Sequence, residues 1–342
     1  MGLYYMVDLK NENVNENELT VIDKINKLLD LDEKFSECEE RIGKLENEFN
    51  NYKNNTDKLL ESYYQQFTTI FLYSDFKAKS FLKYNHLLNL ELLDFLDNLC
   101  KKYGLEYWLD CGSLLGAIRH NGFIPWDDDI DVCMIRKDYD KLVEIIEYEL
   151  KCNGLSDDLI ISMNVNSHKL MPALQLLYSG GLKGTILAGL DIAPYDFIED
   201  ISICNSEYYK QIQKIVYDKN REGIHINDAV KYYINEFKVS YETKPYMIPG
   251  VDSGYELFEG YHFHVLDTEK IFPLKKIEFE NKLYYAPKDA DYYLTNIYGE
   301  YFTMPKLIHH HYHRFDILKR MENGIEFYKE QIFKMKKVNG SY

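Results

Sequence analysis

Three features that would place this 342-residue sequence in common protein classes are missing. It has no dense block of Lys and Arg, and its formal net charge is −16. Because a nucleic-acid-binding protein needs a basic surface to neutralise phosphates, this charge argues against nucleic acid as a partner. No window approaches the ~20 apolar residues that a membrane-spanning helix needs. The first residues have neither a basic start nor a long apolar run, so they do not predict a signal peptide.

Cysteine pairing motifs are also absent. The six cysteines are scattered, and no two of them form a Cys-x-x-Cys pair. Most lie in apolar surroundings, which is typical of reduced, buried thiols. A reducing compartment is the simplest setting for them, so we expect a cytoplasmic protein. A terminal helix over residues 315–337 ends on Lys334, Lys336 and Lys337, which suit a helix C-terminus; attachment to a membrane surface is the alternative.

One stretch, from Trp108 to Val132, concentrates residues that suggest chemistry. It reads WLDCGSLLGAIRHNGFIPWDDDIDV, and its apolar and β-favouring residues predict a strand over 105–110. A short helix is expected from Ser113, as its N-cap, to about His120. The turn Asn121-Gly122 follows, and a second strand is expected over 129–135.

Two details of this stretch indicate phosphate chemistry. Gly112 and Ser113 put a flexible residue and a hydroxyl at a helix start, where backbone N–H groups can meet a phosphate. Asp129 and Asp131 are spaced i, i+2 on a strand, so both carboxylates project from one face. Adjacent carboxylates repel each other unless a cation lies between them. Hard oxygen ligands of this kind suit Mg²⁺ or Mn²⁺.

The segment GSLLGAIRHNGFIPWDDDIDV resembles the signature of the LicD family, the phosphocholine-transferase-like proteins that include the fukutin-related glycan modifiers. That family is a branch of the nucleotidyltransferase superfamily, in which Gly-Ser at a helix start precedes Asp-x-Asp on the next strand. Weaker matches follow in the expected order, so that the resemblance covers roughly residues 85 to 315. They are Leu190–Asp196 (LDIAPYD), Phe272-Pro-Leu, Ala286-Pro287 and Tyr298–Pro305 (YGEYFTMP).

The resemblance implies an α+β fold with a mixed β-sheet flanked by helices. It implies a Mg²⁺-dependent transfer of a phospho-alcohol, such as phosphocholine, from a CDP-activated donor to a sugar hydroxyl. The acceptor would be a cell-surface glycan or its precursor, in lipopolysaccharide, capsule or teichoic acid. By resemblance, Asp191 is the third metal carboxylate beside Asp129 and Asp131, and Gly112 and Ser113 contact the donor phosphate.

Two other functions stay open. One is a nucleotidyltransferase that leaves a nucleoside monophosphate on its target. The other is a non-catalytic coiled-coil assembly protein with a decayed transferase domain.

Other residues of the motif have weaker assignments. Arg119 either reaches a phosphate or the leaving nucleotide, or forms a surface salt bridge. Asp127 lies on the same side as Asp129 if the strand begins early; otherwise Asp127 and Asp128 shape the loop. Trp126 either covers the nucleotide or packs beneath the turn, and we favour packing.

Two basic candidates lie further along the chain. Lys169 is a candidate phosphate contact. His311 belongs to the run His309–His313 (HHHYH), which either binds zinc or contacts acceptor or phosphate. We favour the second interpretation of this run.

The N-terminal part has a different pattern. After a flexible tail over 1–18, apolar residues alternate in steps of three and four, which predicts a coiled-coil segment over 19–66 and a homo-oligomer. They are Leu28, Leu31, Phe35, Cys38, Ile42, Leu45, Phe49 and Tyr52. A helical hairpin folding back on the catalytic domain is the alternative. We expect that domain over 67–315 and a C-terminal helix over 316–342.

Periodicity also predicts the elements around the motif. Helices are expected over 81–103, ended by Gly104, and over 136–152. Strand-like runs follow at 159–163, 173–178 and 186–192, and Pro194 is expected to stop the last of them just after Asp191. Residues 200–270 are expected to form a helical subdomain. A β-hairpin around Asn281-Lys282 and a helix over 289–297 complete the prediction.

Overall fold

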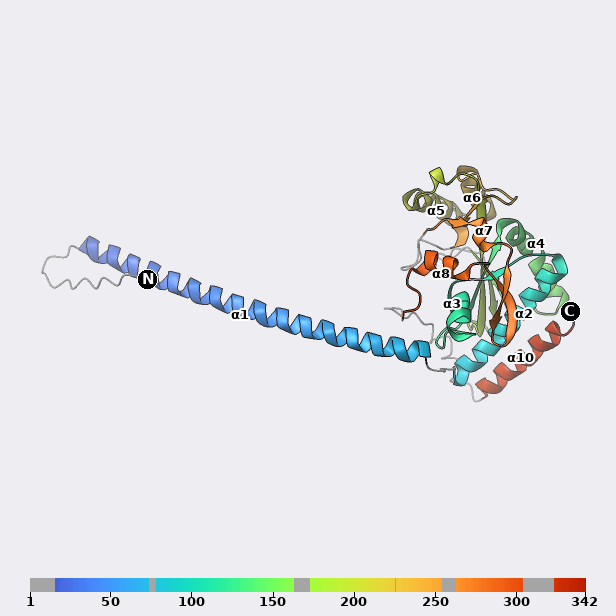
Figure 1. Cartoon of the computed structure of the whole chain (residues 1–342), viewed down its shortest axis with the longest axis horizontal. Helices are drawn as coiled ribbons and strands as arrows, with labels where there is room; N and C mark the ends of the chain where they lie inside the picture. The colour runs from blue at the N-terminus through green and yellow to red at the C-terminus, as the bar shows by residue number, and fades with distance from the viewer. Residues whose placement is uncertain (1–15, 74–77, 163–172, 225, 254–262, 304–322) are drawn as a thin grey trace. The chain divides into compact units, whose positions relative to one another are not determined.

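The computed structural model describes residues 16–73, 78–162, 173–224, 226–253, 263–303 and 323–342 (Figure 1). The fold is α+β, as predicted. Its described elements are α1 (Glu16–Tyr73), α2 (Ser80–Tyr103), β1 (Trp108–Leu109), α3 (Cys111–His120), β2 (Ile130–Ile135), α4 (Arg136–Cys152), β3 (Leu159–Ser162), β4 (Leu174–Tyr178), β5 (Ala188–Ile198), η1 (Ile201–Ile203), α5 (Ser206–Arg221), α6 (Ile226–Glu236), β6 (Tyr246–Pro249), η2 (Val251–Ser253), β7 (Leu266–Asp267), α7 (Thr268–Ile271), β8 (Lys275–Phe279), β9 (Lys282–Ala286), α8 (Ala290–Tyr298) and α10 (Gly324–Asn339).

The chain divides into two compact units, Met1–Phe67 and Thr68–Tyr342. Within the first unit, residues from Glu16 onward lie in α1, one continuous helix of 58 residues. The alternative of a helical hairpin in this segment is therefore wrong, because the helix has no break at which it could turn. In the part of the chain that the structure describes, no helix is both long enough and apolar enough to cross a membrane.

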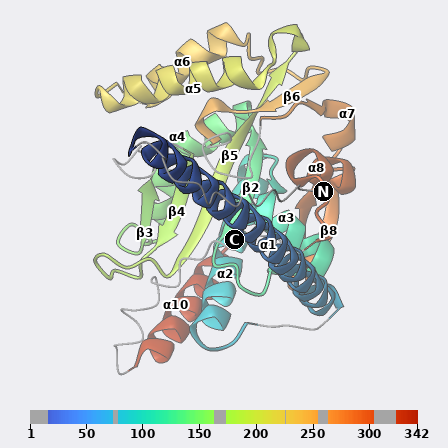
Figure 2. The ribbon, with the colours of Figure 1, turned by 90° about the vertical axis from the view of Figure 1, so that its left-hand side faces the viewer.

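A seven-stranded mixed sheet is the centre of the second unit (Figure 2). Its main strand order is β1-β2-β5-β4-β3, and β6 and β7 extend it from β5. The pairing of β2 with β5 is parallel, and the other pairings are antiparallel. Apolar side chains of the two central strands, such as Val132, Leu190 and Ile192, are buried. Burial of such side chains contributes about 1.5–3 kcal/mol each, so these strands are firmly held.

Strand β5 differs from the prediction. It continues through Pro194 to Ile198, so Asp191 lies inside the strand and not at its end. Pro194 is tolerated because of its place in the ladder. On that side of β5, pairing with β4 ends at Ile192 and pairing with β6 begins at Tyr195. The Pro194 carbonyl accepts from the Gly250 N–H at 2.9 Å, so the missing N–H of Pro194 faces the interval between the two partner strands.

Helix α2 matches its predicted bounds to within a residue. Its buried face includes Leu88, Leu92, Phe95 and Leu99, and Gly104 ends it in the left-handed conformation with φ 66°. Helices α2 and α10 lie side by side and pack against each other (Figure 1). The C-terminal helix is therefore built into the second unit.

Residues 200–270 are not purely helical. Helices α5 and α6 pack together over a second, smaller core, but β6 and β7 also come from this segment and extend the main sheet. Strands of four and two residues are too short to show a clear alternation in the sequence. The predicted hairpin is confirmed as β8–β9, turning at Glu280-Asn281, and α8 confirms the helix after it.

Candidate active site

The register of the two central strands brings two predicted site residues together. Asp131 of β2 and Asp191 of β5 are Cα partners in the parallel ladder. Neighbouring strands lie about 4.8 Å apart, so residues that are partners in register project their side chains from the same part of the sheet. The Gln175 side-chain amide, from β4, donates to Asp191 Oδ1 at 3.0 Å. This amide orients one carboxylate of the pair.

The loop before β2 adds further carboxylates. One carboxylate oxygen each of Asp127, Asp128 and Asp129 lies within 4.8 Å of the others. Strand β2 begins at Ile130, one residue later than predicted, so Asp129 belongs to the loop. Asp129 therefore reaches the site from the loop end and Asp131 from the strand.

Gly112 is required by close packing at this cluster. A Cβ atom added to Gly112 would lie 2.6 Å from Asp127 Oδ2 and 3.5 Å from Asp131 Oδ2. The two carboxylates therefore converge over the surface that the glycine leaves open. This explains the glycine by the space that the carboxylates need, which the sequence pattern did not indicate.

Ser113 is not the N-cap of α3, as predicted. The helix begins at Cys111, with Asp110 at the N-cap, because the chain turns two residues earlier through Cys111 at φ 40°. Ser113 Oγ accepts a hydrogen bond from the backbone N–H of Asp131 at 2.9 Å. Ser113 thus joins the first turn of α3 to the strand that carries a predicted metal ligand.

The electrostatics of the cluster are unusual. Burial, followed by the charges of Asp129, Asp191, Asp127 and Asp110, raises the pKa of Asp131 well above its ordinary value. Burial and the neighbouring carboxylates Asp129 and Asp128 raise the pKa of Asp127 in the same way. Carboxylates that raise one another's pKa disfavour the ionised state, and a bound cation would relieve this repulsion.

The residues present fit a hard divalent cation. The donor set consists of carboxylate oxygens, as Mg²⁺ and Mn²⁺ prefer, and Gly112 leaves the space between two of them clear. Asp129, Asp131 and Asp191 were the predicted ligands, and the loop places Asp127 close enough to join them. A divalent ion bound here would neutralise phosphate charge and polarise a phosphoryl oxygen.

Asp110 is a site neighbour that sequence reasoning missed. It is buried, its carboxylate accepts from the Tyr293 hydroxyl at 2.6 Å, and the thiol of Cys133 donates to it at 2.7 Å. Tyr293 is carried by α8, 183 residues away in the chain. The only sequence signal was an acidic residue at the end of an apolar strand.

Helix α2 holds the acidic loop through polar groups on its buried face. The side-chain amides of Asn85 and Asn89 donate to the Asp128 carbonyl at 3.1 and 2.9 Å. Asn89 Oδ1 also accepts from the Gly189 N–H, at the start of β5. His86 Nε2 donates to the Asp127 carbonyl at 2.7 Å. Two asparagines four residues apart on an otherwise apolar helix face were the available signal, because buried amides need partners.

Arg119 contacts backbone carbonyls and an aromatic ring. Its guanidinium donates to the carbonyls of Tyr301 and Thr303 at 2.8 and 3.3 Å and lies over the Phe71 ring at 4.6 Å. Burial lowers the pKa of Arg119 to about 10. No carboxylate of the described residues forms an ion pair with it, so the salt-bridge alternative is not formed there. Its contact with phosphate stays a prediction.

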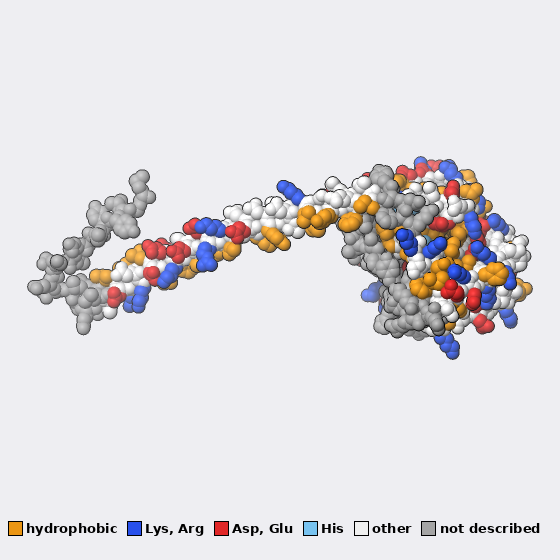
Figure 3. All heavy atoms as spheres, turned by 90° about the horizontal axis from the view of Figure 1, so that it is seen from below, with side chains coloured by type: hydrophobic (Ala, Val, Ile, Leu, Met, Phe, Trp, Pro, Cys, Tyr) orange, Lys and Arg blue, Asp and Glu red, His pale blue; other side chains and the backbone are white. Residues whose placement is uncertain are grey.

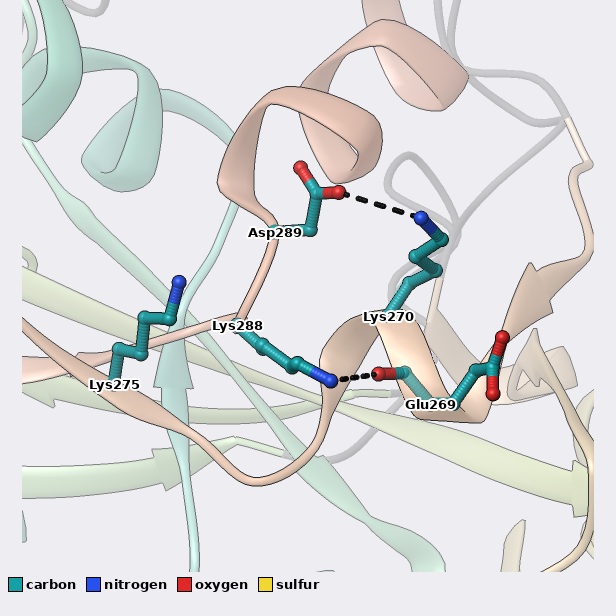
Figure 4. Close-up of a pocket in the computed structure, with 5 residues that line it drawn as sticks. All are labelled: Glu269, Lys270, Lys275, Lys288 and Asp289. Carbon is teal, nitrogen blue, oxygen red and sulfur yellow. Dashed lines mark hydrogen bonds and ion pairs between the residues drawn. The ribbon is translucent and has the colours of Figure 1, made fainter.

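The remaining candidates have different outcomes. Trp126 packs against Phe71 with 4.7 Å between ring centroids, which agrees with the packing alternative. Lys169 and His311, with the run around it, lie outside the described residues. A separate surface pocket is lined by residues that include none of the predicted site residues (Figure 4): Glu269, Lys270, Lys275, Lys288 and Asp289. Lys270 forms an ion pair with Asp289, and Lys288 donates to the Glu269 carbonyl.

This region of the chain is similar in sequence to known proteins. Residues 104–168 match the LicD/FKTN/FKRP nucleotidyltransferase domain. The chain is 50% identical over 64 residues to the lipopolysaccharide cholinephosphotransferase LicD of Haemophilus influenzae, which covers 19% of the chain and 24% of that protein. It is 54% identical over 35 residues to human ribitol 5-phosphate transferase FKRP, or 10% of the chain and 7% of that protein. The LicD resemblance is confirmed, and the match spans about a quarter or less of these relatives.

Proposed function

We propose that this protein is a Mg²⁺-dependent phosphotransferase of the LicD type. It moves a phospho-alcohol, such as phosphocholine, from a CDP-activated donor to a sugar hydroxyl of a cell-surface glycan or its precursor. The observation that carries the proposal is the group of loop carboxylates Asp127–Asp129 beside the paired residues Asp131 and Asp191, next to the first turn of α3. The similarity over residues 104–168 to a cholinephosphotransferase and a ribitol phosphate transferase supports the reaction class.

The residues have complementary tasks in such a transfer. Asp129, Asp131 and Asp191 hold the divalent ion, with Asp127 as a further ligand. The first backbone N–H groups of α3, at Gly112 and Ser113, are not needed for helix hydrogen bonds and are available to a donor phosphate. Phosphoryl transfer needs mainly positioning and charge neutralisation, which fixed carboxylates and backbone donors supply.

The acceptor hydroxyl also needs a group that takes its proton. Asp191 lies between Asp131 and Gln175 in the sheet register, and the Gln175 amide holds one of its two oxygens. The charge of Asp191 raises the pKa of Asp131, so the Asp191 carboxylate lies near the proposed ion and can act as its ligand and as the proton acceptor. We assign this double task to Asp191 because general bases are most often carboxylates or histidines held in place by a second hydrogen bond.

A donor panel tests the function directly. The full chain is incubated with Mg²⁺, a phosphorylatable glycan acceptor, and CDP-choline, CDP-ethanolamine, CDP-ribitol or CDP-glycerol in turn. Release of free CMP with one donor, and its loss in Asp131→Asn, are the expected results. Transfer of labelled nucleotide onto the acceptor would support the alternative of a nucleotidyltransferase. Turnover that is unchanged in Asp131→Asn would contradict both functions at this site.

A further inference from the structure

The long helix α1 carries an apolar stripe whose side chains are exposed. Seven of its seam residues have exposed fractions between 50% and 72%: Leu28, Leu31, Phe35, Ile42, Leu45, Phe49 and Tyr52. Figure 3 shows hydrophobic side chains along this helix, interspersed with charged ones. Most helical stability in proteins comes from packing of an apolar face, so a helix of this length with such a stripe needs a partner.

The spacing of the stripe identifies the kind of partner. Steps of three and four residues place Leu28, Phe35, Ile42 and Phe49 at heptad positions a, and Leu31, Cys38, Leu45 and Tyr52 at positions d. This seam repeats every 3.5 residues, the period of a left-handed coiled coil. Gly43 and Asn50, poor helix formers, fall at position b on the outer side of the helix, where packing does not depend on them.

The charges beside the seam identify the partner as a second copy of this chain. In a parallel, in-register pair, each g residue faces the e residue five positions later on the other helix. Four consecutive g–e pairs are complementary: Lys27 with Asp32, Lys34 with Glu39, Arg41 with Glu46, and Glu48 with Lys53. In the last pair the acidic residue is at g and the basic residue at e, so the two charges are still opposite.

An antiparallel pair does not have this property. In that arrangement g residues face g residues and e residues face e residues. Three of the four g residues, Lys27, Lys34 and Arg41, are basic, and three of the four e residues are acidic. An antiparallel pair therefore sets like charges opposite each other, which disfavours it.

We propose that α1 forms a parallel, in-register, two-stranded coiled coil with α1 of a second copy of this chain. Cys38 lies at position d and is an exposed free thiol in the single chain. In the proposed dimer it faces Cys38 of the other copy across the seam. In a parallel coil both chains continue into Thr68–Tyr342 at the same end, so one dimer carries two copies of the unit to which the proposed function is assigned.

Sedimentation of the full chain tests the number of copies. At micromolar concentration we expect a mass of twice 40.6 kDa. The double variant Ile42→Asp/Leu45→Asp places charges in the seam and should sediment as a monomer. The control Asn47→Asp/Asn51→Asp adds the same charge on the outer side and should remain dimeric. A monomeric or trimeric wild-type chain would overturn the proposal.

Cross-linking tests the direction and register. Mild oxidation should produce a disulfide-linked dimer that disappears in Cys38→Ser. Moving the thiol to the outer position f, with Glu40→Cys in the Cys38→Ser background, should not restore the cross-link. These variants are made in a Cys152→Ser background, which removes a second exposed thiol. A dimer by mass that gives no Cys38 cross-link, or a cross-link that persists in Cys38→Ser, would then contradict the parallel register.

Charge reversal tests the pairing independently of the thiol. Lys34→Glu/Arg41→Glu should weaken association roughly 10- to 100-fold, because each affected g–e pair becomes repulsive. Adding Glu39→Lys/Glu46→Lys to the same chain should restore the affinity. An antiparallel dimer would be nearly insensitive to the first change, because Lys34 opposite Arg41 would only become Glu opposite Glu. That outcome would overturn the parallel arrangement.

Discussion

Ionisable side chains lie near both ends of β2, where it pairs with β5, and their surroundings differ. At one end, Asp131 and Asp191 are partners in register, and burial and neighbouring carboxylates raise the pKa of Asp131. At the other end, the chain continues from β2 into Arg136, whose guanidinium forms bidentate hydrogen bonds with Asp196 of β5 and with Asp252 of η2. The same two strands therefore support one cluster in which carboxylates oppose one another and one in which they share a cation.

The difference separates a structural charge cluster from a functional one. Burial alone would lower the pKa of Arg136, but Asp196 and Asp252 raise it well above its ordinary value, so this cluster is stable as it stands. The Tyr233 hydroxyl, from α6, also donates to Asp196 at 2.7 Å, which joins the α5–α6 subdomain to the sheet. Around Asp131, in contrast, burial and the charges of the described carboxylates Asp129, Asp191, Asp127 and Asp110 all raise its pKa. A ligand that brings positive charge is the physical solution there.

Removing the cation of the compensated cluster should have the largest effect. Arg136→Met leaves Asp196 and Asp252 buried without their partner, so we expect the free energy of unfolding to fall by about 3–5 kcal/mol. Urea unfolding followed by circular dichroism measures this loss. Arg221→Met is the matched control, because its ion pair with Asp218 is exposed and contributes little. If both variants lowered the free energy of unfolding equally, Arg136 would have no special structural role.

Changing the acidic cluster should affect activity and not stability. Asp131→Asn removes one metal ligand and some charge repulsion, so the rate of CMP release should fall roughly 10²- to 10³-fold, a loss typical of one strong electrostatic contact. The free energy of unfolding should stay the same or rise slightly. Asp228→Asn, an exposed carboxylate paired with Lys231, serves as the control. If Asp131→Asn lowered the unfolding free energy but left the rate of CMP release unchanged, the acidic cluster would have a structural role and not a functional one.

Gly112→Ala tests the convergence of carboxylates over the glycine. The added Cβ would meet the end of the Asp127 side chain and not the backbone, so stability should change little. A shift of about 1 Å at a reacting site can still lower the rate roughly 10²-fold, and we expect a loss between tenfold and that value. Gly43→Ala is the control, because nothing lies within 4 Å of its added Cβ. Wild-type CMP release from Gly112→Ala would contradict the close packing.

Asn89→Ala tests how α2 holds the acidic loop. It removes the donor to the Asp128 carbonyl and the acceptor of the Gly189 N–H, both in the protein interior. We expect a loss of about 1–3 kcal/mol in unfolding free energy, together with a lower rate of transfer. Asn98→Ala, a half-buried asparagine on the same helix, should be nearly neutral. Unchanged unfolding of Asn89→Ala would show that the loop holds its shape without α2.

Metal binding should raise the stability of the fold modestly. Mg²⁺ at ten times its dissociation constant should stabilise the fold by about 1.4 kcal/mol, measured as a rise in melting temperature. The raised pKa values of Asp127 and Asp131 mean that the metal-free folded state takes up protons more readily than the unfolded state, so its stability increases as pH falls. Protons compete with the metal, so the gain from Mg²⁺ should shrink from pH 7 to pH 5. A gain that is independent of pH would place the ion elsewhere.

Much of the local structure could be predicted from the sequence. The bounds of α4 agree with the prediction, and α2 and the β8–β9 hairpin agree closely, because hydrophobic periodicity and turn residues act over short distances. The motif stretch predicted Asp129 and Asp131 on one strand, but β2 begins at Ile130, so only Asp131 lies on it. The helix start in this stretch was placed two residues late, because Cys111 adopts a left-handed conformation that its residue type does not indicate.

Long-range partners could not be predicted. Tyr293 reaches Asp110, and Asn85 and Asn89 reach the acidic loop, through packing of elements that are far apart in the chain. Pro194 was expected to stop β5, because the sequence does not show that its missing N–H faces a gap between two partner strands.

The sequence by itself determined the motif residues and the heptad pattern of α1, and the resemblance that the motif carries implied the α+β class. These properties depend on residue type and spacing within one segment. Only the tertiary structure decided that Asp191 lies inside β5 beside Asp131, that Arg136 joins Asp196 to Asp252, and that α2 holds the acidic loop. Such pairings depend on strand register and on packing between distant segments, which local sequence preferences do not specify.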